Sequence, residues 1–122
     1  DALYNMTETD VRHQGKFEDS IGIYPEFIDG YGILILPTTG RYMQLPYRAM
    51  LPKNVDSLLV TGRATGGDKV AHAATRNMSC CSVNGQGAGV AAATAVKSNS
   101  LVKDVSLESV QKELKLQGVR IY

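Results

Sequence analysis

The sequence predicts an α+β chain: antiparallel strands come first, a strand–loop–long-helix unit follows, and a further helix lies near the C-terminus. Three observations predict this order. Short apolar runs in residues 16–48 are separated by prolines and by glycine-containing turn signals. Residues 79–98 are mostly small or apolar and contain no proline, which suits one long helix. Residues 107–116 place apolar side chains about one helical turn apart.

The first third of the chain is expected to be β-rich. Residues 1–15 are polar and mixed, and we expect an irregular segment with room for one short helical turn. Residues 21–24 predict a strand that ends at a proline, and Asp29-Gly30 is a turn signal. Residues 32–36 form a continuous apolar run, which favours a buried strand, and residues 41–45 alternate as a further strand does. Together they predict an antiparallel meander.

The middle of the chain predicts a strand, a loop and a long helix. Residues 58–61 (LLVT) are expected to form a strand that ends at Gly62-Arg63. Residues 66–68 are flexible by composition. The helix is expected from Ser79, a good N-cap residue, to Ser98.

Glycines inside this helix need a packing reason, because each costs about 1 kcal/mol relative to alanine. Gly85, Gly87 and Gly89 therefore predict very close approach to another backbone or to a ligand. Residues 87–92 (GAGVAA) also fit the loose dinucleotide-binding fingerprint, with Asp104 further along. That fingerprint requires a strand immediately before it, whereas helix is expected there, so we interpret the glycines as packing residues.

The C-terminal part predicts a shorter, amphipathic helix. A break at residues 99–100 ends the long helix. Asp104 or Ser106 is expected to cap a helix over residues 107–116, and Gly118 is its expected C-terminal stop.

Composition and charge exclude several classes of function. The 122 residues, 43% of them apolar, suit one modest domain. Acidic and basic residues are mixed and the net charge is +1, which gives no electrostatic case for nucleic acid or an anionic membrane. No apolar run approaches the roughly 20 residues that a membrane-spanning helix needs. With no secretory pattern either, we expect a soluble protein, and the cytoplasm is the favoured compartment.

The two cysteines, Cys80 and Cys81, are neighbours in the sequence. Adjacent cysteines rarely form a disulfide with each other, because the small ring that such a bond closes strains the peptide between them. They are also too few for a zinc site. We therefore expect no metal and two small, reduced, buried side chains, with a redox pair as the alternative.

One segment carries a pattern that suits an anionic ligand. A strand end at Gly62 places a loop at the carboxyl edge of a sheet, where α/β proteins bind ligands. A helix N-terminus near residues 77–80 offers free N–H groups and a positive dipole end. Arg63, His72 and Arg76 add donors around the same place. The alternative is an ordinary strand–loop–helix unit with surface arginines, and the residues alone leave both interpretations open.

Four blocks of the sequence resemble a known family. They are residues 17–22 (FEDSIG), 45–52 (LPYRAMLP), 58–63 (LLVTGR) and 72–89 (HAATRNMSCCSVNGQGAG). The family elements are Phe-x-Asp-Ser-Ile-Gly, Ile-Pro-Tyr-Arg-Ser-Leu-Leu-Pro, Leu-Leu-Val-Ala-Gly-Arg, and His-x-x-x-Arg-x-Met-Pro-x-Cys ending in Gly-Gln-Ala-Ala-Gly. In order and spacing, the chain resembles the FAD-dependent oxidoreductase family related to fumarate reductase and succinate dehydrogenase flavoproteins.

The resemblance implies a larger FAD/NAD(P)-binding α/β fold, of which this chain is the C-terminal portion. In such proteins an N-terminal Rossmann segment binds the ADP part of FAD, a middle domain covers the flavin and the substrate, and the C-terminal segment returns to the FAD domain. On this basis residues 1–48 end the substrate-domain sheet, residues 49–98 form the flavin-facing strand–loop–helix, and residues 99–122 form a C-terminal capping helix.

The resemblance also implies site residues, with FAD as cofactor and a small molecule as substrate. The expected cofactor contacts, at a ribityl-facing turn and a helix start that meets the flavin carbonyl, are Gly62, Arg63, Arg76, Asn77, Met78 and Ser79. His72 and Arg76 fall where related flavoproteins place ligands of a substrate anion, which makes them the candidate catalytic residues.

Departures from the family pattern define the rival interpretation. Ser79 stands where the family often has proline, and both residues start helices. The loop at residues 64–70 is unlike the family's common loop, so the resemblance does not give the substrate. No Gly-x-Gly-x-x-Gly follows a strand, so we expect an ADP-binding half elsewhere in the polypeptide or in another chain. The alternative is a non-catalytic, flavoprotein-derived fragment that acts as a structural or partner-binding module. By itself the chain would expose an apolar face, so we expect it to associate with another chain or with itself.

Overall fold

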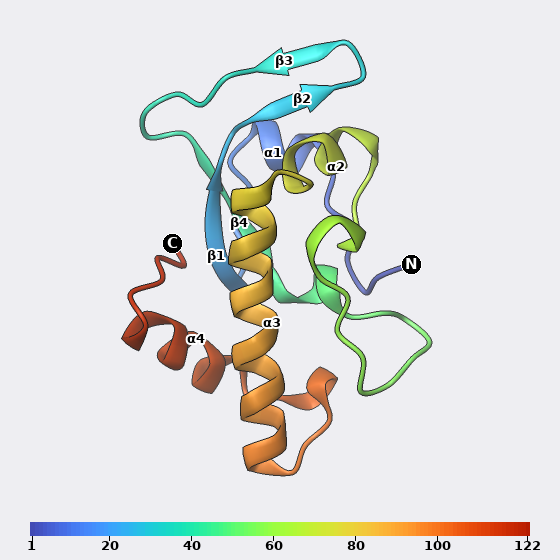
Figure 1. Ribbon diagram of the computed structural model, residues 1–122, viewed down its shortest axis with the longest axis vertical. Helices are drawn as coiled ribbons and strands as arrows, with labels where there is room; N and C mark the ends of the chain where they lie inside the picture. Colours follow the sequence, from blue (N-terminus) through green and yellow to red (C-terminus); the bar gives the residue numbers. More distant parts are fainter.

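The computed structural model describes residues 1–122 as an α+β arrangement of two small antiparallel sheets and four helices (Figure 1). The predicted fold class is confirmed. The elements in chain order are α1 (Glu8–Arg12), β1 (Ser20–Pro25), β2 (Ile28–Gly30), β3 (Ile33–Ile35), β4 (Tyr42–Pro46), the 3-10 turns η1 (Tyr47–Met50) and η2 (Gly62–Ala64), α2 (Lys69–Thr75), α3 (Met78–Ser98), the 3-10 turn η3 (Val102–Asp104) and α4 (Leu107–Leu116).

The strands form one long, interrupted ribbon. β1 pairs with β4 and β2 pairs with β3, both antiparallel, so the β2–β3 hairpin extends from the end of the β1–β4 pair (Figure 1). The turn predicted at Asp29-Gly30 lies two residues too early in the sequence. Those residues are in β2, and the turn is formed by Tyr31 and Gly32, whose φ angles are 54° and 77°. Two positive φ angles match the twist of a two-residue hairpin.

The predicted burial of residues 32–36 is also wrong. In and after β3, Leu34 is 66% exposed and Leu36 is 64% exposed. Ile28, on the other face of the hairpin, is fully buried, and Ile33 and Ile35 pack partly against the core. A continuous apolar run does not distinguish a strand buried on both faces from one covered on a single face.

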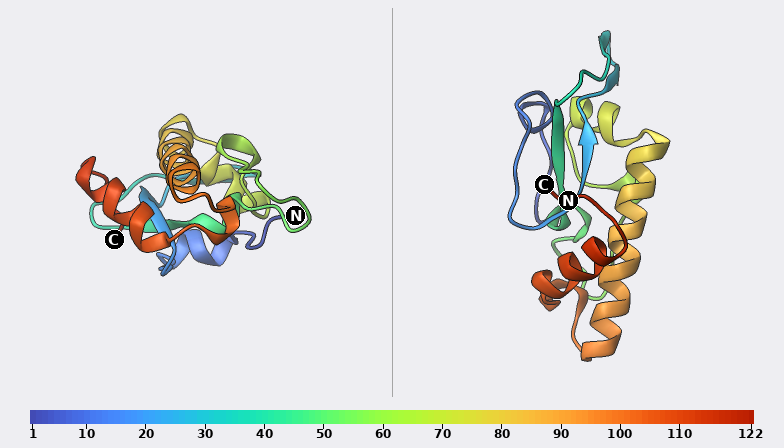
Figure 2. Two further views of the ribbon diagram at one scale, coloured as in Figure 1. Left: turned by 90° about the horizontal axis from the view of Figure 1, so that it is seen from below. Right: turned by 90° about the vertical axis from the view of Figure 1, so that its left-hand side faces the viewer.

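Helix α3 packs against one face of the β1–β4 pair, and α1 lies on the other face (Figure 2, right). The contact with β1 is closest at two glycines. A Cβ atom on Gly87 would lie 2.5 Å from Cδ1 of Ile21, and one on Gly22 would overlap a methyl carbon of Val83. Gly87 therefore has the packing reason that the sequence predicts. The main core lies between this helix and the ribbon, and α4 covers its lower part.

The strand predicted at residues 58–61 is absent. The segment is extended but belongs to no sheet, and Leu58 is 44% exposed. Its link to the rest of the backbone is the hydrogen bond from Val60 N to Met50 O, 2.8 Å long. A strand is defined by a ladder with a neighbour, and no other strand of the chain lies beside this one.

Helix α2 was not predicted, because the glycine-rich residues that precede it are typical of a loop. The carboxylate of Asp68 caps it by accepting from Val70 N and Ala71 N. Helix α3 then begins at Met78 with Asn77 as N-cap residue, so the predicted Ser79 cap is wrong by two residues.

The C-terminal prediction is confirmed in its bounds and its stop. Ser106 caps α4 by accepting from Ser109 N, rather than Asp104, and Gly118 follows the helix with a φ of 82°. No helix of this structure combines the length and the apolar character that crossing a membrane would require.

Candidate functional site

The candidate site joins two structural features: the η2 turn and the junction between α2 and α3. The η2 turn contacts both α2 and α3, and these two helices also contact each other. In Figure 1 the turn lies beside α3 and the junction lies at the upper end of that helix. Of the predicted residues, Gly62 and Arg63 lie in the turn, while His72, Arg76, Asn77, Met78 and Ser79 lie in α2 or at the junction.

The η2 turn begins at a position that only glycine suits. Gly62 has a φ of 67°, and a Cβ atom built there would meet nothing within 4 Å. Its carbonyl accepts two hydrogen bonds from Thr65, from N at 3.3 Å and from Oγ1 at 2.9 Å. Arg63 is exposed and forms no ion pair. The turn therefore presents backbone and one free guanidinium to the outside.

Asn77 joins α2 to α3 and leaves the start of α3 open. Its Nδ2 donates to Ala74 O at 2.7 Å and to Ala73 O at 3.3 Å, so the side chain caps the end of α2 and not the beginning of α3. The first three N–H groups of α3, from Met78 on, have no acceptor within the chain. Met78 is 81% exposed. Ser79 is also exposed, whereas Cys80 is buried, so the helix start presents two free donors and a positive dipole end at the surface.

His72 lies on α2, and Arg76, one helical turn later, is the C-cap residue of that helix. Both side chains are half-buried. Nη2 of Arg76 donates to Asp29 O at 2.7 Å, which ties the junction to β2. The guanidinium keeps further donors, because it carries five N–H groups. His72 makes no side-chain hydrogen bond within the chain.

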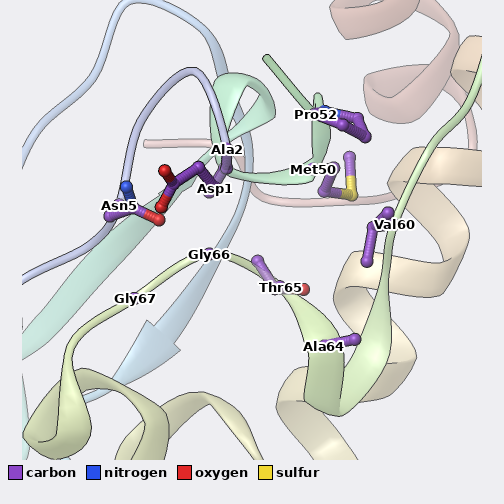
Figure 3. Close-up of a pocket in the computed structure, with 11 residues that line it drawn as sticks. Asp1, Ala2, Asn5, Met50, Pro52, Val60, Ala64, Thr65, Gly66 and Gly67 are labelled. Atoms are coloured by element: carbon purple, nitrogen blue, oxygen red, sulfur yellow. The ribbon is translucent and has the colours of Figure 1, made fainter. Parts of the chain in front are cut away.

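A cavity of about 380 Å³ lies beside the turn (Figure 3). Asp1 and Asn5 form a polar side, and Met50, Pro52 and Val60 form an apolar side. Of the η2 turn it includes only Ala64, and the next three residues, Thr65, Gly66 and Gly67, also line it. Neither this cavity nor any other in the molecule includes one of the predicted site residues.

Two of the sequence blocks are held together by a carboxylate–arginine pair. Asp19 is 3% exposed and accepts three hydrogen bonds from Arg48: from the backbone N at 2.8 Å, from Nε at 3.0 Å and from Nη2 at 3.2 Å. The neighbouring Tyr47 donates its hydroxyl to Val102 O at 2.7 Å, and burial raises the pKa of Tyr47 to about 12. These motif residues therefore fix the framework.

Sequence reasoning missed one buried polar pair near the turn. Asn84, 2% exposed, directs Nδ2 toward Thr65 Oγ1 at 3.5 Å and toward Cys80 Sγ at 4.0 Å. Thr65 is 8% exposed. The sequence feature that could have indicated this pair is an asparagine on a helix face whose other residues are small or apolar.

The cysteines are both free thiols. Burial, with a smaller contribution from Cys81, raises the pKa of Cys80 to about 12. Cys81 is half-buried, and its Sγ lies 3.6 Å from the carbonyl oxygens of Thr75 and Arg76. No group of three or more His, Cys, Asp or Glu side chains is arranged to hold a metal ion.

The comparisons with known proteins give one match. The sequence model of the family described as "FAD dependent oxidoreductase" matches residues 1–114. No curated protein and no solved structure gives a significant match.

Proposed function

The chain belongs to the FAD dependent oxidoreductase family, and from this premise we propose that it is the C-terminal, flavin-contacting part of such an enzyme. The observation that carries the proposal is the start of α3, where the N–H groups of Met78, Ser79 and Cys80 have no acceptor within the chain and the first two residues are exposed. A helix N-terminus of this kind stabilises negative charge on a ligand. The η2 turn, with open space around Gly62, is its neighbour.

The residues present fit the flavin end of FAD. The open helix start suits a ring carbonyl that gains negative charge, and the turn suits a ribityl chain that needs close backbone approach. For the ADP end, no Gly-x-Gly-x-x-Gly follows a strand in this chain. We therefore propose that the ADP-binding half lies in another part of the polypeptide or in another chain.

Bound FAD supplies the electron-transfer chemistry of its flavin ring. The chain's residues then have two tasks. The N–H groups of Met78 and Ser79, at the exposed start of the helix, would stabilise negative charge at the ring's carbonyl and so would favour the reduced form. Arg76 and His72 orient an anionic group of a small-molecule substrate. Arg76 suits this role because the contact with Asp29 O fixes one end of its guanidinium while other donors remain free.

Two unpartnered surfaces support contact with an FAD domain. Gly85 and Gly89 lie on the outer face of α3, and Cβ atoms there would meet nothing within 4 Å. These two glycines have no packing reason inside this chain, in contrast to Gly87. The extended segment at residues 58–61 has no strand partner. We propose that both surfaces are covered by the FAD domain.

A pair of glycine variants tests the cofactor site. Gly62→Val and Gly40→Val place the same side chain at positive-φ turn positions with open surroundings, where φ is 67° and 80°. Both variants should lose similar stability, because the backbone strain is similar. Only Gly62→Val should weaken FAD binding by the natural polypeptide, by about tenfold or more, since a branched side chain blocks close approach.

The measurement is a fluorescence titration of FAD into each variant, with thermal unfolding recorded in parallel. Equal affinities for Gly62→Val and Gly40→Val would contradict the assignment of the turn. Failure of the unmodified polypeptide to bind FAD at all would favour the non-catalytic module.

A further inference from the structure

The inner face of α3 buries one amide among small and apolar side chains. Asn84 is 2% exposed, and its other buried neighbours on the helix are glycine, alanine, valine and Cys80. Buried amides normally make short, well-aligned hydrogen bonds. Here the two contacts of Nδ2 are long: 3.5 Å to Thr65 Oγ1 and 4.0 Å to Cys80 Sγ. Fold stability alone therefore gives a weak reason for an amide at this position.

The contact of Asn84 with Thr65 leads directly to the η2 turn. Thr65 Oγ1 donates to Gly62 O at 2.9 Å, and the N–H of Thr65 donates to the same carbonyl at 3.3 Å. Asn84, Thr65 and Gly62 thus form a chain of polar groups from the inside of α3 to the turn. Figure 3 shows Thr65 at the end of the turn nearest the cavity.

No other hydrogen bond joins this turn to α3. The flanks of the turn are attached elsewhere: Val60 N donates to Met50 O at 2.8 Å, and Gly66 N donates to Ala49 O at 2.9 Å. Both of these bonds attach the segment to the η1 region. The distance between the turn and α3 is therefore set, among polar contacts, by Asn84 alone.

We propose that Asn84 is a positioning residue that acts through Thr65 to hold the η2 turn at a fixed place on α3. This inference rests on the proposed function, in which the turn and the start of α3 contact the same cofactor. A ligand that touches both elements requires a constant separation between them, and tenths of an ångström change such contacts. The cofactor-facing groups themselves remain those of the turn and the helix start.

The first test needs no cofactor. In Asn84→Leu, amide hydrogen exchange at the N–H of Thr65 should be about twofold to fivefold faster, since a hydrogen bond is worth at most about 1 kcal/mol at this length. Exchange at the N–H of Val60 should be unchanged, because that group donates to Met50 O. Thermal stability should stay the same or rise, because leucine fills a similar volume without a buried amide. Unchanged exchange at Thr65 would overturn the inference, and so would severe loss of stability.

The second test uses FAD and a matched pair at the other end of the contact. Thr65→Val removes the hydroxyl and Thr65→Ser keeps it. Asn84→Leu and Thr65→Val should each weaken FAD binding by about threefold to tenfold and shift the flavin's midpoint potential, whereas Thr65→Ser should retain both. The double variant should be no weaker than either single one, because both break the same contact.

The two proposals fail in different ways. If the unmodified polypeptide binds FAD and these variants bind it equally well with the same potential, the inference is overturned and the proposed function stands. If the unmodified polypeptide does not bind FAD, the proposed function is overturned, and the cofactor role of Asn84 with it.

Discussion

Asp19 and Arg48 show how single residues fix the framework that carries the site. A buried carboxylate accepts three hydrogen bonds, two of them from a guanidinium whose side chain is half exposed. The pair joins the segment before β1 to the turn after β4. Because the carboxylate also satisfies a backbone N–H, its removal leaves a donor without a partner.

We expect Asp19→Ala to lower the free energy of unfolding by about 1–3 kcal/mol, since it leaves the backbone N–H of Arg48 without its acceptor. Asp29→Ala is the control, because the Asp29 side chain is exposed and unpaired. It should cost no more than about 0.5 kcal/mol. Urea unfolding of both variants measures the difference. Equal midpoints would contradict the structural role of Asp19.

The buried thiol of Cys80 makes the fold sensitive to alkali. Burial raises its pKa from the ordinary 9.0 to about 12, and burial raises the pKa of Tyr47 from 10.0 to about 12. Both groups keep their protons in the folded state at pH values where the unfolded chain releases them. Their contribution to stability is therefore complete below about pH 9 and is lost as the pH rises toward 12.

Urea unfolding at several pH values from 8 to 11 should show stability falling by up to about 1.4 kcal/mol per pH unit for each such group. Cys80→Ala should reduce the fall between about pH 9 and 10, where the thiol is the first of these groups to ionise when unfolded. An identical slope with and without Cys80 would contradict this assignment.

At the residue scale, the sequence placed the cofactor candidates in two neighbouring features but did not give their contacts. The bond from Arg76 to Asp29 O joins residues 47 positions apart, and no local pattern predicts it. The role of Asn77 was also beyond prediction, because an asparagine between two helices is able to cap either one.

At the scale of elements, α3 organises the molecule through its glycines. Gly87 faces Ile21 of β1, whereas Gly85 and Gly89 face open space. The same substitution should therefore have opposite effects at neighbouring positions of one helix.

Gly87→Ala should lower the free energy of unfolding by about 1–3 kcal/mol, because the added methyl group overlaps Ile21. Gly85→Ala and Gly89→Ala should raise it by up to about 1 kcal/mol in the chain studied by itself, since alanine is the better helix former. Chemical unfolding of the three variants measures this contrast. A stabilising Gly87→Ala would contradict the close packing of α3 on β1.

Elements that local pattern defines were predicted, and elements that neighbours define were not. The long helix has a continuous run of small and apolar residues and α4 has its own cap and spacing, and the bounds of both were close to the structure. The strand expected at residues 58–61 depends on a partner strand, and the burial of residues 32–36 depends on what covers the hairpin. Helix α2 was missed because its capping aspartate follows two glycines, which are typical of a loop.

At the scale of the whole molecule, apolar side chains remain uncovered in several places. Tyr31, Leu34 and Leu36 are exposed on the hairpin, and Val96 is 82% exposed on α3. With a net charge of +1, electrostatic repulsion between copies is weak. These surfaces fit a chain that packs against further protein.

We expect this chain, produced by itself, to associate at high concentration. Light scattering should give a mass that rises with concentration, since exposed apolar area drives association. Adding an FAD-binding partner segment should return the mass to that of a one-to-one complex. A strictly monomeric chain at every concentration would contradict the account of these surfaces.

The central claim, that this chain completes an FAD site, is tested most directly by a visible absorption spectrum of the natural polypeptide, with the intact mass recorded on the same sample. The account predicts the absorption band of bound flavin and a mass well above that of residues 1–122. A colourless protein with the mass of this chain alone, and no uptake of added FAD, would contradict it.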